Sequence, residues 1–385
     1  MKKPTFIIAA GVAACCAVFA AGCAGGKTQN LAVLSSNWYS GTGYNGFQPT
    51  ICEDNAPEFS AEKITYKVTH EQLAEKYQNK YYSVTYGEGT YVTEFYAADF
   101  SYENFGYPSE FIEEYSEKGT FKAYCYKTVL DIPSVTFTLK SDETAPKTLE
   151  GDYVETESWF LSVKDYLRPL YSVQKVKNVT PNTRRPAKLE EGYAYKTYDR
   201  VYENFYSVDG KSVITKTTDN RAKENKTSVS ESIDLSKSKN SLFDLNSLDV
   251  VARATNLSAG SGLLQAISLY IPKSGTVENF NLAGSDRPLL SDETKNKELL
   301  TALEGKLKEK ELYTPVEKGL QTVAVTVNYT GTQPGGAQTY WFAAIENKRN
   351  NVGRATMLKL SMPVSYNLGT INYTLESFQS NLWNK

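Results

Sequence analysis

The sequence has few of the residues on which metal and nucleophile chemistry depends. Among 385 residues there is one His, His70, and there are five Cys, of which Cys15 and Cys16 lie near the N-terminus. One His cannot by itself form a His-rich zinc site or a facial triad. The remaining Cys are too few for a zinc ribbon or an iron–sulfur cluster. We therefore expect no metal site and no cofactor.

Charge of either sign is not in excess. The chain has 42 Lys and Arg against 44 Asp and Glu, a formal net charge of −2, which argues against a nucleic-acid partner. A hydrophobic fraction of 41% excludes global disorder. Tyr, by contrast, is abundant, with 28 residues. Aromatic residues favour β-strands, and Tyr also serves sugar-binding and adhesive surfaces. Composition alone leaves both uses open.

The N-terminus has the features of an export signal. Lys2 and Lys3 precede the uncharged apolar run Phe6–Ala21, which is shorter than the roughly 20 residues that a membrane-spanning helix needs. The small residues before Cys23 resemble the lipobox of bacterial lipoproteins, although the position usually held by Leu is Ala20. In that family the Cys is diacylated and becomes the first residue of the mature protein. The alternative is an ordinary secretory signal with a chance Cys.

The resemblance to lipoproteins implies a cellular location and a division of the chain into three parts. Residues 1–22 would be the lipoprotein signal peptide, residues 23–58 a lipidated tether leading into the domain, and residues 59–385 a β domain. Two acyl chains on Cys23 would hold the protein firmly on a membrane. We therefore expect an extracytoplasmic protein, anchored to a bacterial membrane by the lipidated Cys23.

Two cysteines of the mature chain have no role in this scheme. Cys52 and Cys125 could form a disulfide, because the expected compartment permits one. The alternative is a pair of buried free thiols. Sequence does not show whether the two residues lie close together.

Strand signals dominate from about Ile64 onward. Strand-forming runs on both sides of Gly87-Glu88-Gly89 and of Asp209-Gly210 predict two hairpins. Residues 219–240 are polar and predict a mobile loop or insertion. Helices are scarce, with candidates at Ser291–Glu304 and Ser109–Tyr115.

The C-terminal part predicts an antiparallel meander with one apolar face. Its four strands are Gln321–Tyr329, Gln338–Ile345, Arg354–Met362 and Thr370–Phe378. Alternation on the third strand sets Leu358, Leu360 and Met362 on one face, opposite Met357 and Lys359. Such an apolar face must be covered by another element or by a ligand.

Several segments together resemble a family of exported bacterial domains of unknown function. They are Ser158-Trp159-Phe160 with Leu167–Ser172, Tyr202–Ile214, Phe243–Ser247, and Tyr340-Trp341-Phe342 with Met362-Pro363. The ordered set covers about residues 150–385. Members of the family fold as a curved antiparallel sheet, a half-open barrel like that of the lipoprotein carriers LolA and LppX. The displaced Pro363 and the insertion at 219–240 depart from the family pattern, and the family has no established catalytic residues to transfer.

We therefore expect a mainly β protein whose curved antiparallel sheet forms a half-open barrel with one or two short helices. Its expected function is non-catalytic binding of a hydrophobic or amphiphilic envelope ligand on the concave face. The residues expected to line this groove are Val325, Val327, Leu358, Leu360, Ile371 and Tyr373. Alternatively, side chains fill the groove and the sheet is an ordinary core. A second functional hypothesis is an adhesive or scaffolding module that binds cell-wall glycan or protein.

No motif points to an enzyme. His70 adjoins Glu71, which would point elsewhere on a strand, so a surface or strand-end role is favoured over a general base. Ser261 between two glycines lacks the spacing of a nucleophile elbow. The expected partners are the membrane, through the N-terminal lipid, and an apolar ligand; the oligomeric state stays open.

Overall fold

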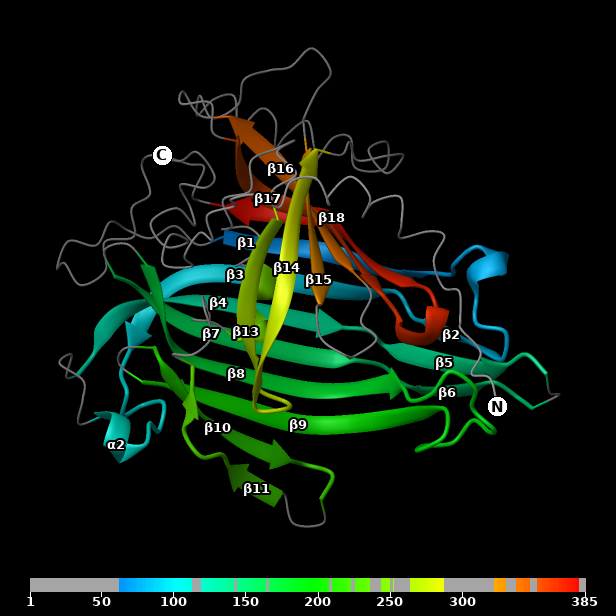
Figure 1. Ribbon diagram of the computed structural model, residues 1–385, viewed down its shortest axis with the longest axis horizontal. Coiled ribbons are helices and arrows are strands. Elements are labelled where there is room, and N and C mark those ends of the chain that lie inside the picture. The colour runs from blue at the N-terminus through cyan, green and yellow to red at the C-terminus, as the bar shows by residue number, and fades with distance from the viewer. Residues whose placement is uncertain are drawn as a thin grey trace, which may run out of the picture.

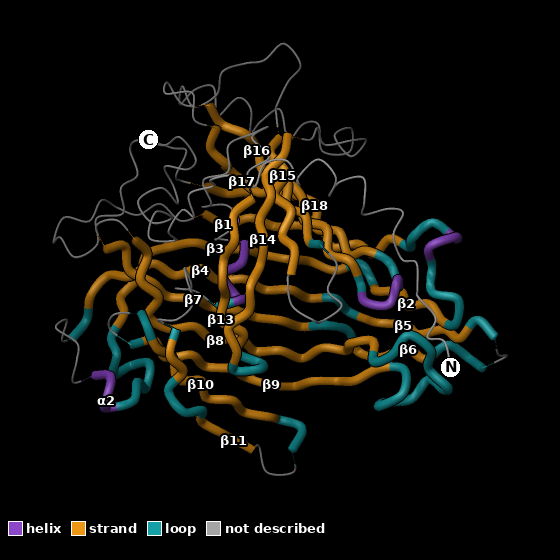
Figure 2. Tube along the Cα trace, in the orientation of Figure 1, coloured by secondary structure: helices purple, strands orange, loops and turns teal. Residues whose placement is uncertain are grey.

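The computed structural model describes twelve stretches of the chain (Figures 1 and 2). They are residues 62–112, 119–141, 144–163, 166–207, 210–222, 226–235, 244–249, 252, 264–286, 322–329, 337–346 and 352–380. The predicted signal peptide, Cys23, Cys52 and the helix expected at 291–304 lie outside these residues.

The domain is built on a 15-stranded antiparallel sheet with the order β11-β10-β9-β8-β7-β4-β3-β1-β18-β17-β16-β15-β14-β13, in which β12 pairs with β10. Its strands are β1 Glu62–Glu71, β3 Gly89–Phe100, β4 Phe121–Asp131, β7 Tyr153–Val163, β8 Tyr166–Pro181, β9 Tyr195–Tyr206, β10 Ser212–Asp219, β11 Lys226–Val229, β12 Ile233–Asp234, β13 Leu264–Ile271, β14 Thr276–Asp286, β15 Thr322–Tyr329, β16 Gln338–Glu346, β17 Val352–Pro363 and β18 Thr370–Ser380. A smaller sheet has the order β2-β5-β6, with β2 Tyr82–Tyr86, β5 Ser134–Leu139 and β6 Lys147–Glu150.

The main sheet curls until its two ends meet through side chains. In Figure 1, β13 and β14 cross in front of β7 and β8. Tyr270 on β13 packs with Tyr206 on β9 and Val213 on β10, and its hydroxyl lies 2.7 Å from Thr215 Oγ1 on β10. Among the described residues, no ladder of backbone hydrogen bonds joins β13 to β10. The expected curved, half-open antiparallel sheet is therefore confirmed.

Of the two predicted hairpins, the one at Asp209-Gly210 is confirmed and the one at Gly87-Glu88-Gly89 is wrong. Val213 pairs with Tyr206 across the first turn, where Gly210 has a φ of 68°. Around the second, β2 pairs with β5, whereas β3 pairs with β1 and β4. The glycines there allow a close crossing between the two sheets: a Cβ on Gly89 would lie 2.3 Å from the Asp131 carbonyl oxygen.

Residues 219–240, predicted as a mobile loop or insertion, contain two short strands. β11 and β12 both pair with β10 within this segment. All four residues of β11 are exposed, so the strand has no apolar alternation from which it could be predicted. It forms through backbone pairing alone. Of the helix expected at Ser109–Tyr115, the described part is α2, Ser109–Ile112.

Two apolar clusters lie on opposite faces of β4. Tyr124 and Tyr126 point into the larger cluster, on the concave side, whereas Ala123 and Cys125 point into the second. The second cluster is completed by residues of α2 and the loop before it, including Phe111 and Tyr107. Because both faces of this strand are covered, its central residues are buried without alternation.

Candidate functional site

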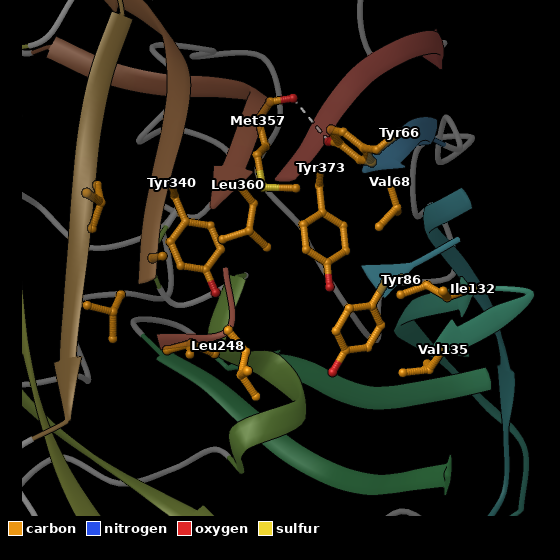
Figure 3. Close-up of a cluster of buried hydrophobic side chains, with 14 of the residues drawn as sticks. Tyr66, Val68, Tyr86, Ile132, Val135, Leu248, Tyr340, Met357, Leu360 and Tyr373 are labelled. Carbon is orange, nitrogen blue, oxygen red and sulfur yellow. Dashed lines mark hydrogen bonds between the residues drawn. The ribbon is translucent and has the colours of Figure 1, made fainter. Parts of the chain in front are cut away.

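The concave side of the main sheet has a continuous row of paired side chains. In cross-strand register, Val325 pairs with Tyr340, Tyr340 with Leu360, Leu360 with Tyr373, and Tyr373 with Val68. All five residues belong to the larger cluster and are at most 5% exposed. Figure 3 shows Tyr340, Leu360 and Tyr373 pointing into a common interior, toward which Tyr86 and Leu248 also extend. The predicted four-stranded meander β15–β18 is thus confirmed and has a buried apolar face.

The residues predicted to line a groove all lie in this interior, which is filled. Val325, Val327, Leu358, Leu360 and Tyr373 are buried in the larger cluster. Ile371, partly buried, packs against it. The structure thus brings the six together, but as core side chains rather than as the walls of an open groove.

One residue of the meander lies on the face opposite to the one expected. Met357 is 6% exposed and belongs to the same cluster as Leu358. The pairing partners explain this: Phe342 pairs with Met357 and Trp341 with Lys359, so Leu358 is the extra residue of a β-bulge. A bulge lets two neighbouring residues face the same side, which strict alternation forbids.

A short segment, Asp244–Asp249 with Ala252, lies inside the curved sheet; we call it the interior segment. It contains the 3-10 helix η4, Leu245–Ser247, which contacts β7 and β13. The Asp244 side chain caps this helix by accepting from the Asn246 backbone N–H at 3.0 Å. Leu248 and Ala252 are buried in the larger cluster. The segment therefore supplies part of the cover that the apolar face requires.

Strands β3 and β4 hold the segment through Asp249. Its Oδ2 accepts from the hydroxyl of Tyr91 on β3, at 3.1 Å, and from that of Tyr126 on β4. Burial, and then the negative charge of Asp249, raises the pKa of both phenols well above the ordinary value. Tyr91 and Tyr126 therefore stay protonated and remain donors to Asp249 Oδ2.

Strands β8 and β9, on the other side of β7, hold the segment through Asp244. Its Oδ2 accepts from the Tyr206 hydroxyl at 2.7 Å and from Ser172 Oγ. Asn204 Nδ2 donates to Ser172 Oγ at 2.8 Å, and Thr215 Oγ1 donates to Asn204 Oδ1 at 2.7 Å. Burial raises the pKa of Asp244, against the hydrogen bonds from Ser172 and Tyr206, which lower it. The segments Leu167–Ser172, Tyr202–Ile214 and Phe243–Ser247, which carried the family resemblance, meet in this network.

A third carboxyl lies at the edge of the interior. Asp152 immediately precedes β7, and its Oδ1 accepts from the Val179 backbone N–H at 2.8 Å. Burial raises the pKa of Asp152 to about 6, and the hydrogen bond from Val179 only partly offsets this. Its negative charge acts on Tyr86 and Tyr373 and helps to raise their pKa. Sequence reasoning did not single out Asp152, Asp249 or the two tyrosines on Asp249, because their neighbours come from distant strands.

His70 has a structural role at the end of β1. Its Nε2 lies 2.9 Å from the Leu368 carbonyl oxygen, and its ring meets that of Tyr86 edge-on at 5.2 Å. Burial lowers the pKa of His70, so the imidazole is neutral near neutral pH. The expectation of a strand-end His is confirmed.

Cys125 lies in the second cluster with an exposed fraction of 0%. Burial raises the pKa of its thiol. It forms no disulfide within the described part of the chain. Its pairing with Cys52 and the lipidation of Cys23 stay predictions, because Cys52 and Cys23 lie outside that part.

The described residues contain neither a metal-ligand cluster nor a membrane-spanning helix. No group of three or more His, Cys, Asp or Glu side chains among them has the arrangement of a metal site. No helix among them is both long and apolar enough to cross a bilayer.

Comparisons with known proteins give a likeness in structure alone. No family model matches the sequence, and no curated protein does. Among solved structures, the fold is similar to that of a β-barrel-like protein from Brucella abortus, a member of the domain of unknown function DUF1849. The TM-score is 0.39 at 10% sequence identity, and the match covers 84% of this chain and 98% of the other.

Proposed function

We propose that the chain is a lipid-anchored lipoprotein of the bacterial envelope that binds a hydrophobic or amphiphilic ligand on the concave face of its curved sheet, without catalysis. The observation that carries this proposal is the short interior segment. It lies over a large apolar face and is fixed to β8 and β9 through Asp244 and to β3 and β4 through Asp249. In the ligand-free state this segment occupies the site, and a ligand takes its place.

The Asp249 contacts indicate which end of a ligand would be polar. The hydroxyls of Tyr91 and Tyr126 converge on one carboxylate oxygen inside an apolar surround. An amphiphile with an anionic head could offer the same acceptor once Asp249 has left. Its acyl chain would then lie along the row that includes Leu360 and Tyr373, with about 0.8 kcal/mol gained for each CH₂ that is buried.

Titration with dodecanoate, followed by calorimetry, tests this assignment. Asp249→Ala removes the competing carboxylate and should tighten binding by about tenfold, because less of the protein is held in the occluded state. Tyr91→Phe combined with Tyr126→Phe should weaken dodecanoate relative to dodecanol, which lacks the anionic head. Tyr82→Phe is a matched control, because that hydroxyl donates elsewhere, to the Thr183 carbonyl oxygen at 2.7 Å.

An absence of dodecanoate binding in both the native protein and Asp249→Ala would refute the ligand assignment and leave the interior as an ordinary core. The anchor is tested separately. Cys23→Ala should move the protein from the membrane fraction to the soluble fraction and abolish incorporation of labelled palmitate. If labelled palmitate is absent from the native chain, the lipoprotein assignment fails.

A further inference from the structure

Three connecting loops meet at the end of the sheet where β1 finishes, at the right in Figure 1. They are residues 72–81, 182–194 and 364–369, and with Lys140 we call them the loop surface. Asn79 joins all three: its Nδ2 donates to the carbonyl oxygens of Arg184 at 3.0 Å and of Tyr366 at 3.1 Å. The Tyr366 hydroxyl donates to the Asn182 carbonyl oxygen at 3.0 Å. The surface is therefore held in one arrangement, which reduces the entropy lost on binding.

Three tyrosines stand exposed on the loop surface, each with a cation over its ring. Their exposed fractions are 57% for Tyr77, 37% for Tyr81 and 49% for Tyr193. The pairs are Lys76 over Tyr77 at 4.7 Å, Arg185 over Tyr81 at 4.7 Å, and Lys188 over Tyr193 at 4.2 Å. A ring beside a positive charge is thus a repeated unit here.

The loop surface also has an excess of positive charge. Within the part of the chain that the structure describes, five of its cations form no salt bridge: Lys76, Lys80, Lys140, Arg184 and Arg185. Lys188 is paired with Glu190, and Glu191 is held by Arg221 at 2.6 Å. This local excess stands out in a chain whose net charge is −2.

We propose that the loop surface binds an acidic polysaccharide. The apolar C–H face of a sugar ring stacks on the face of a tyrosine ring opposite the cation, while a carboxylate on the same sugar accepts hydrogen bonds from the neighbouring Lys or Arg at the ring edge. A polymer that repeats this pair of groups matches a surface that repeats ring and cation. A single-stranded nucleic acid would call for a positively charged groove that follows several nucleotides, whereas the loop surface also contains Glu75, Glu190 and Glu191.

The loop surface lies at the far end of β1 from the residue at which the described chain begins. The N-terminal segment joins β1 at Glu62, and the loops begin after Glu71 at the other end of this 10-residue strand. At about 3.3 Å per residue the two ends are about 30 Å apart.

Affinity electrophoresis of the full chain through gels that contain oligogalacturonate tests the proposal, with dextran oligomers of equal length as the neutral comparison. We expect retardation by the acidic oligomer alone, reduced by added salt. Arg185→Gln and Tyr193→Ala should each weaken binding about fivefold, the size expected for one ring–cation contact. Matched controls are Lys226→Gln, which removes an exposed cation on β11, and Tyr153→Ala, which removes an exposed tyrosine whose hydroxyl faces Glu155.

The proposal is overturned if dextran binds as tightly as oligogalacturonate, if neither binds, or if the control variants weaken binding as much as Arg185→Gln does. Stronger capture by oligo-dT or by phosphatidylglycerol vesicles would overturn it in favour of those partners. Each variant is checked by near-ultraviolet circular dichroism. Dodecanoate binding is measured in parallel, so that failure of the interior site and failure of the loop surface are told apart.

Discussion

Removing one buried charge at Asp152 should make the protein more stable at neutral pH. The folded state raises the pKa of this carboxyl from its ordinary value of 3.8 to about 6, chiefly by burial. A pKa difference of about two, at 1.36 kcal/mol for each unit, corresponds to about 3 kcal/mol of free energy of unfolding. Asn is nearly isosteric with Asp, and its Oδ1 can still accept from the Val179 backbone N–H.

The sign of this effect follows from proton binding. Between about pH 4 and pH 6 the folded state binds more protons at Asp152 than the unfolded state does, so stability falls as pH rises through this interval. Asp152→Asn abolishes that contribution. The variant should match the native protein near pH 4 and exceed it by as much as about 3 kcal/mol at pH 7.

Urea unfolding at a series of pH values from 4 to 7.5, at constant ionic strength, measures this difference. Asp131→Asn, on an exposed carboxyl at the end of β4, controls for the loss of one negative charge. If the difference between Asp152→Asn and the native protein is the same at every pH, or if the variant is less stable at pH 7, burial does not dominate at this site and the reasoning is wrong.

Three further predictions concern packing, backbone conformation and thiol burial. Leu248→Ala should lower the free energy of unfolding by about 2–5 kcal/mol, because it empties part of the interior. Leu245→Ala, on the exposed side of the same segment, should change it by less than about 0.5 kcal/mol. Equal losses of the two variants in urea unfolding would contradict the assigned packing. Gly369→Ala should cost more than Gly106→Ala, because both have positive φ but only at Gly369 would the added Cβ meet atoms closer than 3 Å; thermal unfolding compares the two. Cys125 should react with a thiol reagent only after unfolding, and labelling of the native chain at the unfolded rate would show that the second cluster is open.

Local pattern predicted those parts of the fold that depend on neighbours in sequence. The Asp209-Gly210 turn needs positive φ, which glycine supplies, and it joins β9 to β10 as expected. The four C-terminal strands and their buried residues, such as Val325 and Leu360, follow from alternation, since the period of side chains along a strand is two. The strand-end position expected for His70 is also found, at the end of β1 beside the Leu368 carbonyl oxygen.

The tertiary structure decided how residues far apart in the sequence pair and pack. The bulge that turns both Met357 and Leu358 inward arises from register with β16, which the sequence of β17 does not encode alone. The glycines before β3 form a crossing rather than a hairpin, because their space is set by the Asp131 backbone.

The candidate site is the clearest case. Asp244 lies 72 residues from Ser172 and 38 from Tyr206, yet the three form one network. Whether the apolar face is open or filled also depends on the fold, because the residues that cover it come from a separate segment of chain. The sequence by itself therefore determined the strands and the apolar face, through short-range periodicity and turn chemistry. Only the three-dimensional closure of the sheet decided what fills that face, because the pairing of distant segments leaves no local pattern in the sequence.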